Sequence, residues 1–475
     1  MHRCWNVPEL TLTILNNIDD HNGPPAPDAV ELHQPLRRSQ TLASLAQTCR
    51  KLSSPALNLL WAAQHDYVPL LSRLPAGTWE LDDGHFNIVR PLRVEDWQRV
   101  FAYSGRINEF LDTGDGPKLD SSVSDAMLAS LPPRPLLPKV RLVFCRSSSP
   151  LFSHLPTLLG ARVSAIRIDL EVEDSWCFPA VRQMASRFPS LERIQIDGNC
   201  TTNADLEWGG ACVTQLHDLR LITVRALNSN TYRHISGLKR LESLTIRSLS
   251  AHKFVFQPRD NLTPSLRFSA LRKLVIGADA LDSICTFLPD VCQAPLERVC
   301  ISATELLSSS ISARYLMEGI ATNCSPSHMM SIRLTLKAVQ GATFRFTSED
   351  IRPVLNLPNL KHVQLCIPTV CSMDDNFVQE MAIAWPALEE LSIFCSYRPS
   401  DSPTPLALVS LACYCPHLHH VGLNVDATRI PLFVVPPIPR QIQCAVVRWT
   451  VGFSSIEQPD AVAKLLSAFV PAWKI

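Results

Sequence analysis

A dense set of side chains that could bind a metal lies between residues 413 and 420 of this 475-residue chain. Cys413, Cys415, His417, His419 and His420 carry thiol and imidazole groups, the ligands that zinc prefers. The paired C-x-x-C spacing of a structural zinc site is missing, and the cysteines lie in an apolar pattern, where cysteine packs as a small hydrophobic residue. We therefore expect neither a metal ion nor another cofactor.

The sequence carries none of the spacings that mark a known catalytic site. It contains no nucleophile elbow, phosphate-binding loop, dinucleotide fingerprint, H-E-x-x-H motif or kinase motif. The serine triplets at 147–149 and 308–310 are typical of loops. Because nothing assembles a nucleophile, a base and an oxyanion site, we expect that the protein is not an enzyme.

One short apolar pattern recurs from residue 137 onward and organises most of the chain. Each copy has an apolar residue, two variable residues, an apolar residue, one variable residue and a third apolar residue, as in Leu241-Glu-Ser-Leu244-Thr-Ile246. Copies begin at residues 137, 163, 191, 219, 241, 271, 296, 329, 360, 388 and 418. The alternating apolar positions predict one short strand a copy, and the segments between copies predict returning helices, several of which end at proline.

This pattern resembles the leucine-rich repeat, a family with a period of about 20 to 30 residues. The resemblance implies an α/β solenoid over residues 132–475, with parallel strands on the concave face and helices on the convex face. The segment 408–423 looks closest to the cysteine-containing subtype of that family. A last strand near 444–449 and a helix near 460–470 would cap the array.

The variable residues of such strands face the concave side, which is usually the binding side. In the first eight copies these positions hold far more basic than acidic residues. The predicted target-binding residues are Arg141, Arg167, Arg193, Arg225, Arg247, Lys273, Arg298 and Arg333. We predict that they form a basic column for an acidic or phosphorylated protein segment. Alternatively, they are ordinary exposed strand residues that the adjacent Glu192, Glu242, Glu297 and Glu389 neutralise.

The N-terminal part of the chain predicts three short helices. The first begins at Pro8, the second after Ser39 or Thr41, and the third at Pro55, with Ser54 as its N-cap. Residues 19–40, which include four prolines, are expected to form a loop. Helices this short cannot bury their apolar faces alone, so one interpretation is an N-terminal cap packed on the following domain.

The residue order in this part also resembles the F-box motif, especially as fungal F-box proteins have it. The matching residues are Val7-Pro8-Glu9-Leu10, Ile14, the segment 42–51, Pro55-Ala56-Leu57 and Leu60-Trp61. In that family the motif binds the Skp-type adaptor of a cullin-based ubiquitin ligase. The resemblance implies that the adaptor-binding or motif-core residues are Pro8, Leu10, Ile14, Leu42, Leu45, Cys49, Leu57 and Trp61.

The predicted domains are an F-box-like module at 1–70, a helical linker at 71–131 and the repeat domain at 132–475. The linker looks similar to that of the same fungal family. An extended piece is expected to lead into an amphipathic helix with Glu95 and Asp96 in its first turn, where the helix dipole favours acidic residues.

Composition and charge restrict the partners and the compartment. The 44 lysines and arginines balance 44 aspartates and glutamates, so no global basic field exists that would attract nucleic acid. We find no secretory leader and no apolar run of the roughly 18 residues that a membrane helix needs. The 16 cysteines, in a chain too long to need disulfides, fit a reduced cytoplasmic or nuclear protein.

The two resemblances together imply a substrate-recognition subunit of a cullin-type (SCF) ubiquitin ligase. The F-box would bind the Skp-type adaptor, and through it a cullin, while the repeats would bind a target protein. The alternative is a leucine-rich-repeat scaffold or inhibitor, unrelated to ubiquitin, whose N-terminal helices only cap the array.

Overall fold

The structure is a computed structural model, and the chain divides into two compact units. The first contains residues Met1–Trp208 and Gln215–His217, and the second contains Gly209–Thr214 and Asp218–Ile475. The structure describes residues 8–18, 36–114, 116–170, 178–198, 213–224, 229–249, 268–291, 294–303, 311–336, 345–397, 402–428, 448–450, 452 and 454–469.

The first unit begins with three helices, α1 (Pro8–Asn16), α2 (Leu36–Thr48) and α3 (Arg50–Leu60). Helix α3 packs against both of the others, and Leu15, Leu42 and Ala56 are buried. The apolar residues at spacings of three and four therefore supply the interior of this bundle.

Two predicted helix boundaries are wrong. Helix α3 does not open at Pro55; it begins at Arg50, and the N–H of Ser53 donates to the carbonyl of Cys49 at 3.0 Å. Pro55 lies inside α3, where its missing N–H costs one backbone bond and the packing of α3 compensates. Helix α2 begins at Leu36, so residues 36–40 of the predicted loop are helical. Residues 19–35 lie outside the described part of the chain.

The segment predicted to be a linker is folded into the first unit. The elements between residues 63 and 130 are β1 (Ala63–Gln64), α4 (Val68–Leu71), β2 (Trp79–Asp82), β3 (His85–Ile88), η2 (Val94–Trp97), α5 (Gln98–Ser104), β4 (Glu109–Leu111), β5 (Lys118–Leu119) and α6 (Ser121–Ser130). Strands β2 and β3 are antiparallel, and β5 joins β3 in parallel. Strands β1 and β4 pair in parallel and start the larger sheet, before the predicted repeat domain begins.

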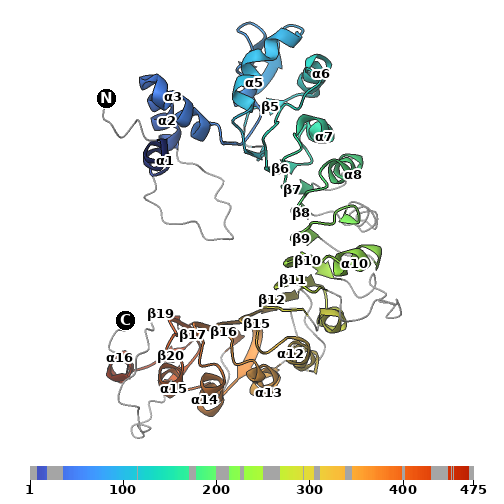
Figure 1. The fold of residues 1–475 in the computed structure, drawn as a ribbon. Helices are drawn as coiled ribbons and strands as arrows, with labels where there is room; N and C mark the ends of the chain where they lie inside the picture. The colour runs from blue at the N-terminus through green and yellow to red at the C-terminus, as the bar shows by residue number, and fades with distance from the viewer. Residues whose placement is uncertain are drawn as a thin grey trace. The chain divides into compact units, whose positions relative to one another are not determined.

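The rest of the first unit alternates strands with helical returns. Its elements are β6 (Leu142–Arg146), η3 (Phe152–His154), α7 (Leu155–Leu158), β7 (Ala165–Leu170), α8 (Phe178–Arg187) and β8 (Arg193–Gly198). The parallel strands lie in the order β1-β4-β6-β7-β8 (Figure 1).

The second unit continues the alternation of strand and helix. Its elements are β9 (Leu221–Val224), α10 (Ser229–Ser236), β10 (Ser243–Leu249), β11 (Lys273–Ala278), α11 (Leu281–Phe287), η6 (Leu288–Val291), β12 (Arg298–Ala303), α12 (Ile311–Asn323), β13 (Ser331–Leu336), β14 (Arg345–Thr347), α13 (Ser348–Ile351), η7 (Arg352–Asn356), β15 (His362–Ser372), α14 (Asp375–Ala384), β16 (Glu390–Tyr397), α15 (Leu406–Tyr414), β17 (His420–Leu423), β18 (Asp426–Ala427), β19 (Arg448–Thr450), β20 (Ser455–Ile456) and α16 (Pro459–Phe469).

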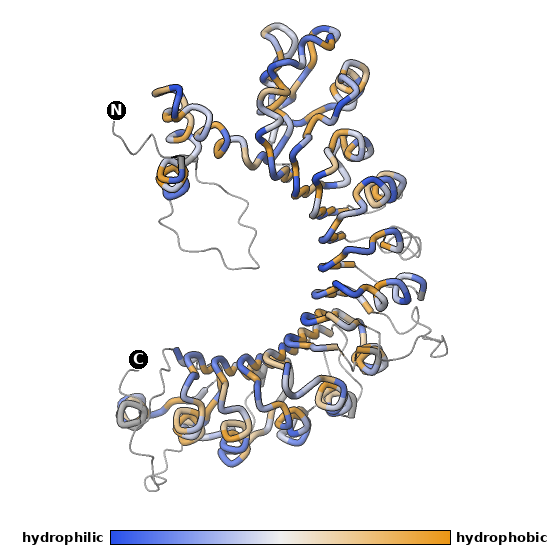
Figure 2. The backbone as a smooth tube through the Cα atoms, in the orientation of Figure 1, coloured by the Kyte–Doolittle hydropathy of each residue, from blue (hydrophilic) through white to orange (hydrophobic). Residues whose placement is uncertain are grey.

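The main strands of this unit form a parallel sheet in the order β9-β10-β11-β12-β13-β15-β16-β17-β19. Their register follows the sequence repeat, since Ser243 pairs with Lys273 and Lys273 pairs with Arg298. In the first unit α6, α7 and α8 lie on one side of the sheet, and in the second unit α10 and α12 to α15 do (Figure 1). Figure 2 shows hydrophobic and hydrophilic residues alternating along the strands. The prediction of an α/β fold built on a large parallel sheet is confirmed. No helix among the described residues is long and apolar enough to cross a membrane.

The first sequence copy is three residues out of register. We predicted Leu137 as the first apolar residue of this copy. In the structure the first apolar position is Val140, followed by Val143 and Cys145; all three are buried, and strand β6 begins at Leu142. Leu137 is buried as well, through an isolated bridge to Leu159. Two overlapping apolar patterns occur here, and the pairing with neighbouring strands selects the later one.

Candidate functional site

Helix α1 exposes apolar side chains on both sides of its buried face. Thr11 and Leu15 are buried, whereas Leu10, Leu12 and Ile14 are 48%, 43% and 40% exposed. Leu10 and Ile14 are four residues apart and therefore share one flank of the helix, while Leu12 lies on the other. Single exposed leucines are ordinary, but an adjacent apolar pair on one helix offers a surface to a partner.

The other predicted adaptor-binding residues divide by burial. Leu42 and Trp61 are only 2% and 7% exposed, so they belong to the interior and cannot bind a partner directly. Leu45, Cys49 and Leu57 are half-buried. Pro8 lies in α1, but its side chain is outside the described part of the structure.

Helix α3 is attached to the segment that follows it. The guanidinium of Arg106 donates to the Ser54 carbonyl at 3.2 Å and also bonds to the Asn58 side chain. The ring of Trp61 packs against that of Tyr103, with centroids 4.8 Å apart. Trp61 and the bonds from Arg106 thus attach α3 to the segment that follows it.

The exposed side of the sheet in the second unit carries two rows of side chains in register. The first row is Ser243, Lys273, Arg298, Ser331, His362, Glu390, His420 and Arg448. The second row is Thr245, Val275, Cys300, Arg333, Gln364, Ser392, Gly422 and Thr450. Residues between these positions, such as Leu244 and Ile246, are fully buried, so the rows point away from the core.

Three basic residues lie together on β11, β12 and β13, and we call them the basic patch: Lys273, Arg298 and Arg333. Lys273 and Arg298 are neighbours in the first row, and Arg333 lies beside Cys300 in the second. Arg298 and Arg333 are exposed and form no hydrogen bond or ion pair with any residue that the structure describes. Burial raises the pKa of the Cys300 thiol, against the opposite effect of Arg333 and Lys273.

The glutamates that could neutralise this patch are paired elsewhere. Glu242 lies 3.9 Å from Arg220, and Glu297 bonds to Arg272. Lys361 Nζ donates to Glu389 at 2.8 Å, which lowers the pKa of that carboxyl. All of these basic partners directly precede a strand and form a charge ladder separate from the basic patch. The predicted neutralisation therefore does not apply to Arg298 and Arg333.

The remaining predicted column residues are not equivalent to the patch. Arg167 donates to Asp197 at 3.2 Å and lies over the Phe144 ring, so an acid neutralises it. Arg193 and Arg247 are exposed, on β8 and β10. Arg225 lies outside the described residues.

The placement of Arg141 in the column is wrong. Arg141 precedes β6, and its carbonyl accepts from Ser164, which precedes β7. It therefore belongs with the residues that precede strands, because the register of the first copy is shifted.

On β15, β16 and β17 the first row holds His362, Glu390 and His420, so imidazole and carboxylate groups follow the basic patch. His420 Nδ1 lies 3.3 Å from Glu390 Oε1, and its Nε2 lies 3.1 Å from Thr450 Oγ1. Among the residues with described positions, no three His, Cys, Asp or Glu side chains group so as to hold a metal ion.

No protein-family model matches the chain, and no curated protein matches its sequence.

Proposed function

We propose that this protein is the substrate-recognition subunit of a cullin-type (SCF) ubiquitin ligase. The observation that carries the proposal is the exposed pair Leu10 and Ile14, which lies in the segment whose residue order resembles an F-box. An apolar pair on one flank of a short helix supports docking of the Skp-type adaptor, because burial of such side chains stabilises protein interfaces.

The other half of the proposed function is target binding by the strands, which we infer to be leucine-rich repeats. The support is a parallel sheet in register with the sequence repeat and an exposed face on which no described residue pairs with the arginines at 298 and 333. Charge-assisted bonds from guanidinium groups suit an acidic or phosphorylated segment of a protein. Transfer of ubiquitin would be done by other subunits, to which this chain supplies proximity.

Capture of the purified Skp-type adaptor by the tagged full-length chain tests the first half. Leu10→Asp with Ile14→Asp should lower adaptor recovery at least about tenfold, because an interface centre tolerates charges poorly. Leu12→Asp is the matched control: it is on the same helix, similarly exposed, but on the other flank. Equal recovery of the adaptor by the wild type and by the double variant would contradict the proposal.

The alternative is a repeat scaffold or inhibitor whose helices α1, α2 and α3 only cap the array. The bonds from Arg106 to α3 and the burial of Trp61 favour it, since both are what a cap requires. In that case neither the wild type nor Leu12→Asp would retain the adaptor.

A further inference from the structure

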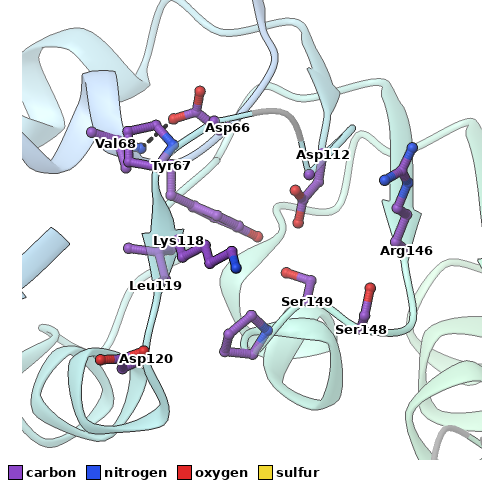
Figure 3. Close-up of a pocket in the computed structure, with 14 residues that line it drawn as sticks. Asp66, Tyr67, Val68, Asp112, Lys118, Leu119, Asp120, Arg146, Ser148 and Ser149 are labelled. Atoms are coloured by element: carbon purple, nitrogen blue, oxygen red, sulfur yellow. Dashed lines mark hydrogen bonds between the residues drawn. The ribbon is translucent and has the colours of Figure 1, made fainter. Parts of the chain in front are cut away.

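The first unit contains a pocket that the proposed function does not use. It has a volume of about 320 Å³, at the small end of the range for ligand sites. The segments around it are the start of α4, the turn after β4, strand β5 and the turn after β6 (Figure 3).

A buried hydroxyl without a partner points into this pocket. Tyr67 is only 2% exposed, its ring packs on that of Phe110 with centroids 4.4 Å apart, and Figure 3 shows its hydroxyl directed toward Asp112 and Lys118. The hydroxyl forms no hydrogen bond with any described residue. Burial raises the pKa of Tyr67 well above its usual value, so the group remains a donor. Buried polar groups normally have partners, and this one lacks an acceptor.

Two carboxylates line the pocket, Asp66 half-buried and Asp112 buried, and Asp112 accepts from the Ser149 hydroxyl and the Gly114 N–H. Burial raises the pKa of both Asp66 and Asp112. Asp66 accepts one bond, from the Val68 N–H at 2.6 Å. A Cβ atom at Gly116 would lie 2.5 Å from Asp66 Oδ2, so glycine allows the backbone to approach the carboxylate. An incoming ammonium group would compensate the charge that burial disfavours.

Two cations line the same pocket. The Lys118 ammonium and the Arg146 guanidinium form no hydrogen bond or ion pair within the described part of the chain. Asp120, which also lines the pocket, lies 3.7 Å from His85 Nδ1. Both charge signs are therefore present in a small volume, where the Arg146 charge partly offsets the effect of burial on the Asp112 carboxyl.

We propose that this pocket binds a small zwitterion of the α-amino acid class. Its ammonium group would lie at Asp66 and Asp112, and its carboxylate would accept from Lys118, Arg146 and the Tyr67 hydroxyl. A ligand with only negative charge would face the carboxylates, and a ligand with only positive charge would face the cations. A zwitterion satisfies both sides and supplies the missing acceptor for Tyr67.

Titration calorimetry of the full-length chain with the twenty free amino acids tests this proposal. At least one should bind with a Kd below about 1 mM. Analogues of that ligand without its amino group, or without its carboxylate, should bind about tenfold more weakly, because each loses charge-assisted bonds. Tyr67→Phe and Arg146→Met should weaken binding of the intact ligand by a similar factor. Arg162→Met, which removes an exposed arginine that does not line the pocket, should leave it unchanged.

Tyr67→Phe keeps the test independent of folding. It removes only a hydroxyl that no described residue bonds, so the melting temperature without ligand should not fall, while the affinity for ligand should. The proposal is overturned if no amino acid binds the wild type, if Tyr67→Phe binds as tightly as the wild type, or if an analogue with one charge binds as well as the zwitterion.

Discussion

The Asp96 carboxylate of the first unit is stabilised by direct hydrogen bonds from its neighbours. It accepts from Arg90 at 2.9 and 3.0 Å and from the Arg93 N–H at 2.9 Å. These bonds lower the pKa of Asp96. A carboxyl whose pKa is lower when folded stabilises the protein above its ordinary pKa, and the contribution is lost as pH falls through the lowered value.

Asp96→Asn should therefore destabilise the protein at pH 7 by about 1 kcal/mol, a modest figure because Arg90 is well exposed to solvent. The difference from wild type should shrink as pH falls below about 3.9, the ordinary pKa of aspartate, because the unfolded chain then takes up a proton while the native carboxyl, whose pKa is lower, stays charged. Urea unfolding between pH 7 and pH 3 measures this. The control is Asp125→Asn, an exposed aspartate that no described residue bonds. A difference that stays constant with pH would contradict the account.

At the scale of elements, α3 contains a proline where a helix ordinarily has none. Pro55 lies five residues after the first residue of α3, so its nitrogen cannot donate to the carbonyl of Lys51. The helix nevertheless forms, because Leu52 and Ala56 are buried against its neighbours. Tertiary packing thus overrides a strong local preference.

Pro55→Ala should raise the free energy of unfolding by about 1 to 3 kcal/mol, since it restores a backbone bond and removes ring crowding. The matched control is Pro69→Ala in α4, where proline is in the first helical turn and costs no bond, so stability should change little. Thermal unfolding and hydrogen exchange of residues 50–60 would measure both. No stabilisation by Pro55→Ala would show that the proline fits its site without strain.

At the scale of the whole molecule, the N-terminal helices and the sheet meet between residues 61 and 71. Strand β1 pairs with β4, and Tyr67, Leu70 and Leu71 are buried. The predicted boundary at residue 70 thus falls after residues that the sheet requires.

Removal of residues 1–60 should leave a soluble, cooperatively folded protein that no longer captures the adaptor. Removal of residues 1–70 should also expose apolar core and cause aggregation, because β1 and the buried residues of α4 are lost. Size-exclusion chromatography and circular dichroism would compare the two. Aggregation of both truncations would favour the capping alternative over a separable docking module.

The summed charge of the molecule is zero, yet its charges are not evenly distributed. Arg298→Glu with Arg333→Glu should lower binding of acidic or phosphorylated peptides about tenfold at low salt, and added salt should weaken wild-type binding. Arg162→Glu serves as the control, because it makes the same change at an exposed site in the first unit. Fluorescence anisotropy with a peptide library measures the effect, and unchanged affinity in the double variant would argue against the basic patch.

Much of this fold is predictable from apolar spacing alone. Leu241, Leu244 and Ile246 are fully buried as their pattern predicts, because alternate residues of a strand point to opposite faces whatever the partner strand is. The helical returns that end at proline follow from equally local chemistry. The exposed basic side chains of β12 and β13 are predictable for the same reason.

Other features depend on contacts between distant segments. The shifted register at β6 and the entry of β4 into the sheet depend on neighbouring strands, since short strands have little preference of their own. Which arginines are neutralised is decided by what lies across the sheet, such as Asp197 beside Arg167. The pocket brings together Asp66, Asp112 and Arg146, and no spacing in the sequence predicts this grouping. Only folding removes these groups from water and places them around one pocket.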